Sequence, residues 1–273
     1  MTENASAFVK AISQFSDPYD RQARLAPALL SISPVTVMAV ALYGDKLGIV
    51  SFIISLLTAC GLLFFLSDFA RGRGKAKEKA LWQKWGGAPS TLVLRHRDNT
   101  TFEPGLVENY HAKLSMLMDK HFPSALEELD DPKTADALYA SACGMLRDST
   151  RDHKTYGLLF RDNISYGFRR NAFGLRKIAI TLCVGSLVWV AIRQGLSIWV
   201  TRLQTATNPE SFFTLNEVTA IGASLVMLLV WSFYITEASV KEAAFCYAKT
   251  LILASETLAS KHKASKAKIP KAK

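Results

Sequence analysis

Residues 25–44 read LAPALLSISPVTVMAVALYG, a run without a single charged side chain. About 20 apolar residues in an α-helix match the thickness of the hydrocarbon core of a bilayer. Three further segments have the same character, namely residues 47–67, 178–200 and 218–236. Only one of them carries a charge, Arg193, whose long side chain can reach the membrane surface while residues 196–200 extend the span. These segments predict four membrane-spanning helices.

The basic residues lie unevenly around these segments. Of the 33 Lys and Arg residues, 19 lie between residues 68 and 177 and 8 follow residue 236, whereas the loops that would join the paired spans hold few. Short cationic loops stay on the cytoplasmic side of a membrane. We therefore expect a multi-pass protein whose N-terminus, central region and C-terminus are cytoplasmic. The same asymmetry in both pairs argues against the alternative, in which some segments are buried helices of a soluble protein.

The predicted fold class is an all-α membrane protein in which two transmembrane helical hairpins flank a mostly helical cytosolic insert. Residues 106–120 and 133–151 show the helical spacing of apolar side chains. We also expect a short extended piece at residues 91–94 and a solvated acidic loop at residues 123–132. Because residues 223–262 contain no Gly or Pro, the fourth span should continue as one helix into the cytosol. The predicted domains are a cytosolic lead (residues 1–24), a first transmembrane hairpin (25–67), a cytosolic domain (68–177), a second transmembrane hairpin (178–236), and a cytosolic helix with a basic tail (237–273).

Small polar side chains inside the predicted spans suggest a pore lining. Pro34 interrupts the backbone hydrogen bonds of the first span and leaves a carbonyl to be satisfied by a neighbour or by water. Such polar stretches occur where a helix packs on protein or lines a wet cavity, so helix packing stays open as the alternative. The candidate pore-lining residues are Ser31, Ser33, Thr36, Thr58 and Thr181.

Two segments are richer in polar and aromatic residues than membrane topology requires. Residues 82–98 read WQKWGGAPSTLVLRHRD, and residues 163–171 read NISYGFRRN. Glycine lets the backbone approach a ligand, Trp offers a stacking face, and Arg suits phosphate. The alternative is that the Trp residues anchor at the membrane interface while the Arg residues contact lipid phosphate or fix the topology. The candidate ligand-binding residues are Trp82, Trp85, Arg95, His96, Arg97, Asn163, Tyr166, Arg169, Arg170 and Asn171.

Nothing in the sequence has the spacing of a catalytic or metal site. The four Cys and five His residues form no metal-binding pattern, and no phosphate loop, HExxH motif or nucleophile elbow occurs. Asp152 and His153 are adjacent, so on a helix their side chains would point in different directions. We therefore expect a protein that is not an enzyme and that has no catalytic residue, metal or cofactor.

The plan of two membrane hairpins around a basic insert, with residues 82–98 and 163–171 beside the membrane, resembles a known group of proteins. These are the four-transmembrane membrane effectors of bacterial nucleotide-signalled anti-phage defence. The resemblance covers nearly the whole chain at the level of its plan, and no residue role is carried over from it. It implies a pore-forming activity in the bacterial inner membrane, a role in antiviral defence, and control by a nucleotide-type signal.

The function predicted is that of an oligomeric inner-membrane ion channel or pore-forming effector, gated by a cytosolic ligand or partner. Four spans with few ionisable groups make a poor conduit alone, so a homo-oligomer in the lipid bilayer would build the pore wall. The alternative function is a membrane anchor or scaffold that docks a cytosolic partner protein. A carrier is less favoured, because the predicted spans hold no carboxylate. The net charge of +10 is explained by topology and anionic lipid, and it leaves nucleic acid open as a further partner.

Overall fold

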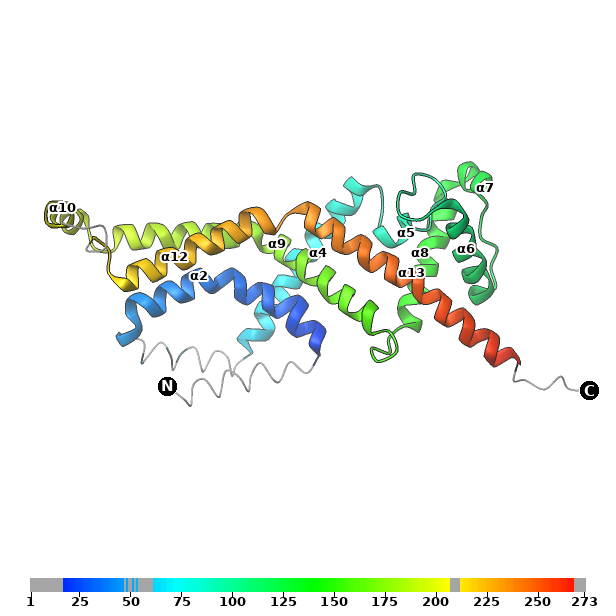
Figure 1. Ribbon diagram of the computed structural model, residues 1–273, viewed down its shortest axis with the longest axis horizontal. Helices are drawn as coiled ribbons and strands as arrows, with labels where there is room; N and C mark the ends of the chain where they lie inside the picture. The colour runs from blue at the N-terminus through cyan, green and yellow to red at the C-terminus, as the bar shows by residue number, and fades with distance from the viewer. Residues whose placement is uncertain are drawn as a thin grey trace, which may run out of the picture. The chain divides into compact units, whose positions relative to one another are not determined.

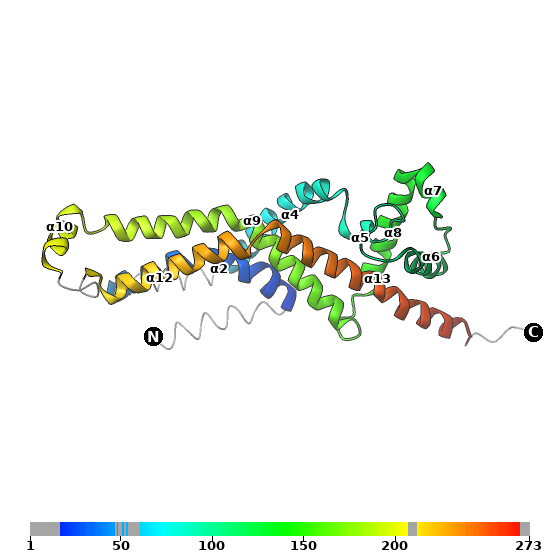
Figure 2. The same ribbon diagram turned by 45° about the horizontal axis from the view of Figure 1, so that its top comes forward.

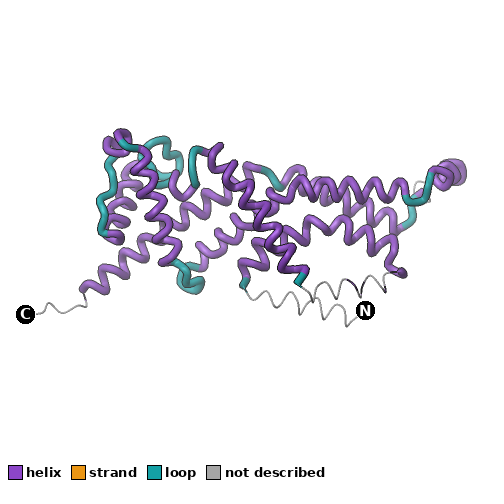
Figure 3. Tube along the Cα trace, turned by 180° about the vertical axis from the view of Figure 1, so that it is seen from behind, coloured by secondary structure: helices purple, strands orange, loops and turns teal. Residues whose placement is uncertain are grey.

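The computed structural model describes residues 17–46, 48, 51, 53, 61–206 and 212–267, and the regular elements in this part of the chain are all helices (Figure 3). The predicted all-α class is therefore confirmed for these residues. The predicted second span, residues 47–67, lies largely outside them, and Thr58 lies outside them too. In chain order the helices are the π-helix η1 (Asp20–Leu25), α2 (Ala26–Tyr43), the short 3₁₀-helix η2 (Gly44–Lys46), α4 (Leu62–Trp85), α5 (Pro89–Leu92), α6 (Pro104–Met118), α7 (Ala125–Asp130), α8 (Pro132–Ser149), α9 (Gly157–Ile192), α10 (Leu196–Thr205), α12 (Leu215–Leu229), the π-helix η3 (Val230–Tyr234) and α13 (Glu237–Ala267).

Three helical stretches are long and apolar enough to cross a membrane. They are Asp20–Tyr43, Gly157–Ile192 and Leu215–Tyr234, and they correspond to the first, third and fourth predicted spans. Fewer than a third of the residues in each apolar window are buried within the chain, so each stretch keeps apolar surface on the outside of the chain. An outward apolar surface of this length fits a membrane protein.

The chain folds into two compact units. Unit 1 consists of residues 1–78 and 167–240, and unit 2 consists of residues 79–166 and 241–273. Unit 1 contains the apolar part of α9 together with α2 and α12, which pack along each other (Figure 1). A cluster of small and apolar side chains forms its core, made of Ala28, Ala70, Ala172, Leu175, Ala179, Cys183, Trp231 and Ile235.

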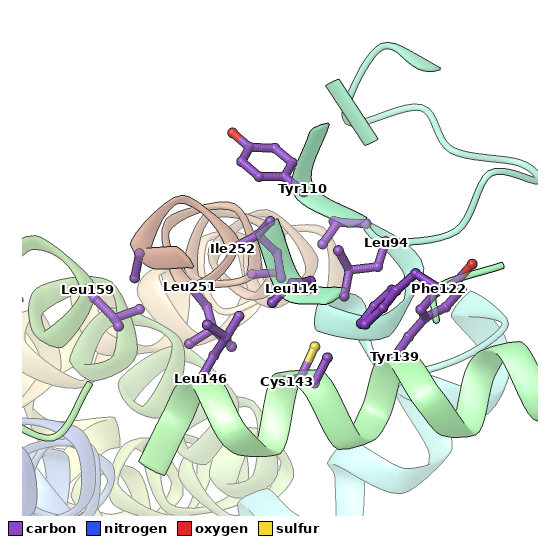
Figure 4. Close-up of a cluster of buried hydrophobic side chains, with 14 of the residues drawn as sticks. Leu94, Tyr110, Leu114, Phe122, Tyr139, Cys143, Leu146, Leu159, Leu251 and Ile252 are labelled. Atoms are coloured by element: carbon purple, nitrogen blue, oxygen red, sulfur yellow. The ribbon is translucent and has the colours of Figure 1, made fainter. Parts of the chain in front are cut away.

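Unit 2 has a hydrophobic core of its own, drawn in Figure 4. One face of α8 supplies Tyr139, Cys143 and Leu146, whose side chains point toward Leu114 of α6 and toward α13. Because unit 2 buries these large side chains by itself, it has the character of a small folded domain. Its core also contains Leu94, Tyr110, Phe122, Leu159, Leu251 and Ile252.

Local signals explain where the helices of unit 2 begin. Pro104 and Pro132 lie in the first turns of α6 and α8, where proline costs no hydrogen bond. The helix α7 begins with a capping box, in which Ser124 accepts from the Glu127 N–H and the Glu127 carboxylate accepts from the Ser124 N–H. The expectation of a solvated loop at residues 123–132 was wrong here, because this box starts a helix. The expected extended piece at residues 91–94 was also wrong, since Pro89 opens the short helix α5.

The expected continuous helix from residue 223 to residue 262 is interrupted. Helix α12 passes into the π-helix η3, the backbone leaves helical geometry at Ile235 (φ −84°, ψ 82°), and α13 begins at Glu237. The third span also ends earlier than expected. Helix α9 stops at Ile192, Gly195 takes a positive φ of 77°, and residues 196–200 belong to the separate helix α10 (Figure 2).

The carbonyl that Pro34 leaves without its helical partner has a nearby donor. Proline lacks the N–H that would bond to the carbonyl of Leu30, four residues earlier. The Ser33 hydroxyl donates to that same Leu30 carbonyl at 2.9 Å. The first span therefore remains one helix across the proline.

Candidate functional site

Two arginines of α9 hold the break between α12 and α13. Arg176 donates from Nε to the carbonyl of Trp231 at 3.0 Å and from Nη2 to the carbonyl of Ser232 at 2.8 Å. Arg169 donates from Nη1 to the carbonyl of Ser239 at 3.0 Å. Residues seven apart lie on one face of a helix, so the two guanidinium groups bind backbone carbonyls on either side of the break. We call this pair the arginine clamp.

The clamp supplies partners that the interrupted helix does not. At the break the Ile235 N–H bonds to the carbonyl of Val230, and the Thr236 N–H bonds to the carbonyl of Tyr234. Neither amide therefore reaches the carbonyls of Trp231 or Ser232, as it would in a regular α-helix. Buried carbonyls need partners, and a charged donor is the strongest available. The break is thus a feature held by specific contacts.

Next to the clamp, α9 packs unusually close to α4 and η1. A methyl group added at Gly174 would lie 2.5 Å from the backbone carbon of Arg73, and one at Gly74 would lie 2.0 Å from the Asn171 amide oxygen. Asn171 is fully buried and donates to the carbonyl of Ala23 at 2.7 Å. Only glycine permits this approach of two backbones. The segment that carries the clamp is therefore fixed within unit 1.

Arg170 lies in the same segment and is buried. It forms an ion pair with Glu78 at 2.9 Å and donates to the Asn171 amide oxygen at 3.2 Å. A buried, paired guanidinium of this kind fixes helix packing. A phosphate would bind Arg170 only by displacing the Glu78 carboxylate.

In unit 2 a buried carboxylate organises the other group of predicted ligand residues. Glu128 has no exposed surface, and it accepts hydrogen bonds from the His96 and Arg97 N–H groups, from the Arg97 guanidinium and from the Tyr139 hydroxyl. Asp136 forms ion pairs with both Arg95 and Arg97 at 2.7 Å. We call these groups the Glu128 network. It ties the loop after α5 to α7 and α8.

The network shifts the ionisation of its members. Burial by itself raises the pKa of Glu128, but the hydrogen bonds from His96, Tyr139 and Arg97 outweigh it and lower that pKa below its ordinary value. For Asp136 burial again acts upward, and the bonds from Arg95 and Arg97 lower the pKa. Both carboxylates are therefore ionised at neutral pH and compensate the charges of the two arginines.

His111 lies beside this network and is buried. Burial lowers its pKa from 6.5 to about 4, against the opposing effect of the hydrogen bond from Nε2 to the carbonyl of Leu94. Its ring meets that of His96 edge-on, with 4.7 Å between the centroids. Both rings line a groove of about 310 Å³ that His121 and Glu108 also line. His111 is therefore neutral at physiological pH.

A second groove of unit 2, of about 440 Å³, lies between α6 and α13. Lys113 and Glu256 form an ion pair across it at 2.7 Å, and Lys263 lines it further along α13. The polar lining includes both charge signs, which suits a polar ligand or a polypeptide. Its other lining residues are Asn109, Ala112, Met116, Ala259 and Ser260.

The remaining predicted ligand residues are dispersed. Trp82 and Trp85 lie half-buried in the last turn of α4, which Gly86 and Gly87 end with positive φ angles. Tyr166 stacks on Tyr247 within unit 2, with 6.2 Å between the ring centroids, and Asn163 is half-buried on α9. The structure thus gathers Arg95, His96 and Arg97 around Glu128, whereas Arg169, Arg170 and Asn171 belong to unit 1.

The predicted pore-lining hydroxyls that the structure describes all bond to their own helices. Ser31 donates to the carbonyl of Ala28, Thr36 to that of Ile32, and Thr181 to that of Lys177, as Ser33 does to that of Leu30. Thr36 and Thr181 are nonetheless exposed on their helix surfaces, whereas Ser31 is buried. Their role in a pore wall stays a prediction.

Arg176 and Glu128 were missed by sequence reasoning. The sequence explains Arg176 only as one of the basic residues that keep the central region cytoplasmic, and it places Glu128 only in an acidic loop. Within the described ranges no group of three or more His, Cys, Asp or Glu residues could hold a metal ion. Comparison with known protein families, curated proteins and solved structures finds no match for this chain.

Proposed function

We propose that the protein is an oligomeric membrane channel or pore-forming protein whose opening is controlled from unit 2. The observation that carries this proposal is the course of α13. This one helix begins at the break that the arginine clamp holds and continues to the residues that line the α6–α13 groove. A ligand or partner in the groove therefore contacts the same helix whose first residues follow a candidate membrane span.

The clamp supplies the two-state element that gating needs. A ligand shifts a conformational equilibrium only if it binds the two states with different affinities. Hydrogen bonds from a charged donor contribute about 1.5–3 kcal/mol each to the state that contains them. Retaining or releasing the bonds from Arg176 is thus enough to change the population of an open state by tenfold or more. We assign the clamped arrangement to the resting state.

The pore itself is proposed to form between copies of the chain. The three candidate spans leave most of their apolar windows unburied, which offers surface both to lipid and to neighbouring copies. The resemblance to anti-phage effectors suggests the bacterial inner membrane, with cytoplasmic termini, as the location and a nucleotide-type signal as the trigger.

The direct test is ion efflux from liposomes that contain the purified full chain. Efflux should increase when cyclic dinucleotides or cyclic oligonucleotides are added on the side that unit 2 faces. If no efflux occurs with or without these probes, at any protein density, the channel proposal fails.

A scaffold is the second candidate function, and one surface favours it. Leu126 and Leu129 of α7 are three residues apart and are 75% and 63% exposed, so they form a small apolar patch on unit 2. A docked protein would cover such a patch. A stoichiometric partner that co-purifies with the chain, and that is lost in the Leu126→Ser/Leu129→Ser variant, would favour the scaffold over the channel if efflux is absent.

A further inference from the structure

The helix α10 joins two candidate membrane spans without continuing either of them. It follows α9 after three residues, and α12 begins at Leu215. In Figure 1 α10 is seen end-on while α9 runs lengthwise, so its axis turns away from the span. At about 1.5 Å per residue, its 10 residues extend for about 15 Å.

One face of α10 is apolar, and its aliphatic side chains are largely exposed, whereas Trp199 is half-buried against the rings of Phe212 and Phe213. Leu196, Trp199, Val200 and Leu203 recur at the helical spacing that places them on one side. Leu196 is 79% exposed and Leu203 is 71% exposed, and no residue of α10 is buried. In water such a face would be costly, since burying apolar surface is the main favourable contribution to folding.

Beside this face, Arg202 attaches α10 to the start of α12. Glu217 has no exposed surface and forms ion pairs with both Arg193 and Arg202 at 2.8 Å. Arg202 also donates to the carbonyl of Phe212, and its guanidinium lies over the Trp199 ring. Glu217 thus compensates the two arginines of the hairpin and fixes the rotation of α10 about its axis, with the apolar face outward.

We propose that α10 is an interfacial helix that lies on the bilayer with Leu196, Val200 and Leu203 in the lipid. It follows the end of α9 after three residues, and the Arg202–Glu217 ion pair holds it at the start of α12, so it lies where two spans end, at the level of the headgroups. A short amphipathic helix with a Trp residue on its apolar side suits this boundary. The Glu217 ion pairs are compatible with this position, because they compensate the charges of Arg193 and Arg202 within the protein.

The test uses the full chain in liposomes, with its four native cysteines replaced. A polarity-sensitive fluorophore is attached to Leu196→Cys or Leu203→Cys on the apolar face, and to Thr201→Cys, an exposed residue on the polar side, as the matched control. We expect blue-shifted emission at positions 196 and 203, with several-fold stronger quenching by lipid-borne nitroxide than by aqueous iodide. At position 201 the order should reverse.

Two results would overturn the proposal. Equal access of iodide to positions 196, 203 and 201 would mean that the face lies in water. Protection from both quenchers would mean that protein, such as a second copy, covers it. If the cysteine-free chain does not fold, the native chain and its Trp199→Phe variant can be compared in brominated lipids. The difference between their emissions is the fluorescence of Trp199. It should be quenched by bromine atoms that lie at a shallow depth in the bilayer.

Discussion

Arg176 of α9 donates from Nε to the carbonyl of Trp231 at 3.0 Å, where the last candidate span ends. The contact joins residues 55 positions apart and satisfies a carbonyl that the helix break leaves without its regular partner. A positive residue beside a span is usually explained by topology. Here the guanidinium group also fixes the geometry of the connection between α12 and α13, so its position and its hydrogen-bonding shape both matter.

The close approach of α4 and α9 predicts a specific effect of added volume. Gly174→Ala should lower the stability of the protein in detergent by about 1–3 kcal/mol, because its new methyl group would meet the backbone of Arg73. Gly185→Ala, on the same helix with open space around it, is the matched control and should leave the melting temperature unchanged or slightly higher. Equal effects of the two changes would contradict the packing described for Gly174.

Glu128 should be far more important for unit 2 than its neighbours in sequence. Glu128→Ala leaves Arg97, Tyr139 and two backbone N–H groups without their acceptor, and should cost about 3–5 kcal/mol of folding free energy. Asp130→Ala removes an exposed carboxylate two residues away and should change stability by less than about 0.5 kcal/mol. Chemical unfolding followed by circular dichroism measures both, and similar losses would refute the buried network.

His111 predicts a loss of stability in mild acid. The unfolded chain takes up a proton on this histidine near pH 6.5 and the folded chain only near pH 4, so protonation favours unfolding and stability falls as the pH drops through that window. The decrease amounts to at most about 3 kcal/mol. The pKa values of Glu128 and Asp136 are lowered, so their contribution is present above their ordinary pKa values and is lost only in stronger acid.

The variant His111→Gln separates the two effects. It keeps a donor for the carbonyl of Leu94 but does not titrate, so its melting temperature should vary less between pH 6.5 and pH 4 than that of the native chain. Parallel curves for the two proteins would show that His111 is not the group responsible.

Glu217 should control the hairpin that carries α10. Glu217→Ala removes the acceptor of Arg193 and Arg202 together with the capping box of α12, and we expect a loss of about 3–5 kcal/mol. Protease cleavage in the α10 segment of reconstituted protein should become faster as α10 detaches. Thr219→Ala, a change of an exposed side chain two residues further along α12, is the control and should leave the cleavage rate as it is.

The sequence predicted those parts of the fold that depend on local composition. Three of the four apolar segments are helices long enough to span a membrane, and the helices α6 and α8 begin within two residues of the predicted positions. The hydropathy of a segment, and the presence of Pro104 or Pro132 at its start, can be read from residues that are close together in the sequence. Helix formation follows from such properties without knowledge of the tertiary contacts.

The features that sequence reasoning missed depend on distant partners. The sequence places Glu128 in a solvated loop, because its partners are distant along the chain: Arg97 lies 31 residues earlier and Tyr139 lies 11 residues later. The break near Ile235 contains no Gly or Pro that would predict it from the sequence. Its stabilising contacts come from α9. A buried charge and its partner are visible only once the chain is folded.

The central claim is that the clamped break controls ion flow, and its most direct test is potassium efflux from liposomes without any added trigger. Arg176→Gln should raise the efflux rate about tenfold over the native chain, because losing about 1.4 kcal/mol from the resting state shifts the equilibrium by that factor. Lys177→Gln removes the same charge from the exposed neighbouring side chain and should leave the rate unchanged. If Arg176→Gln and Lys177→Gln give the same efflux as the native chain, the break is not a gate and the account is wrong.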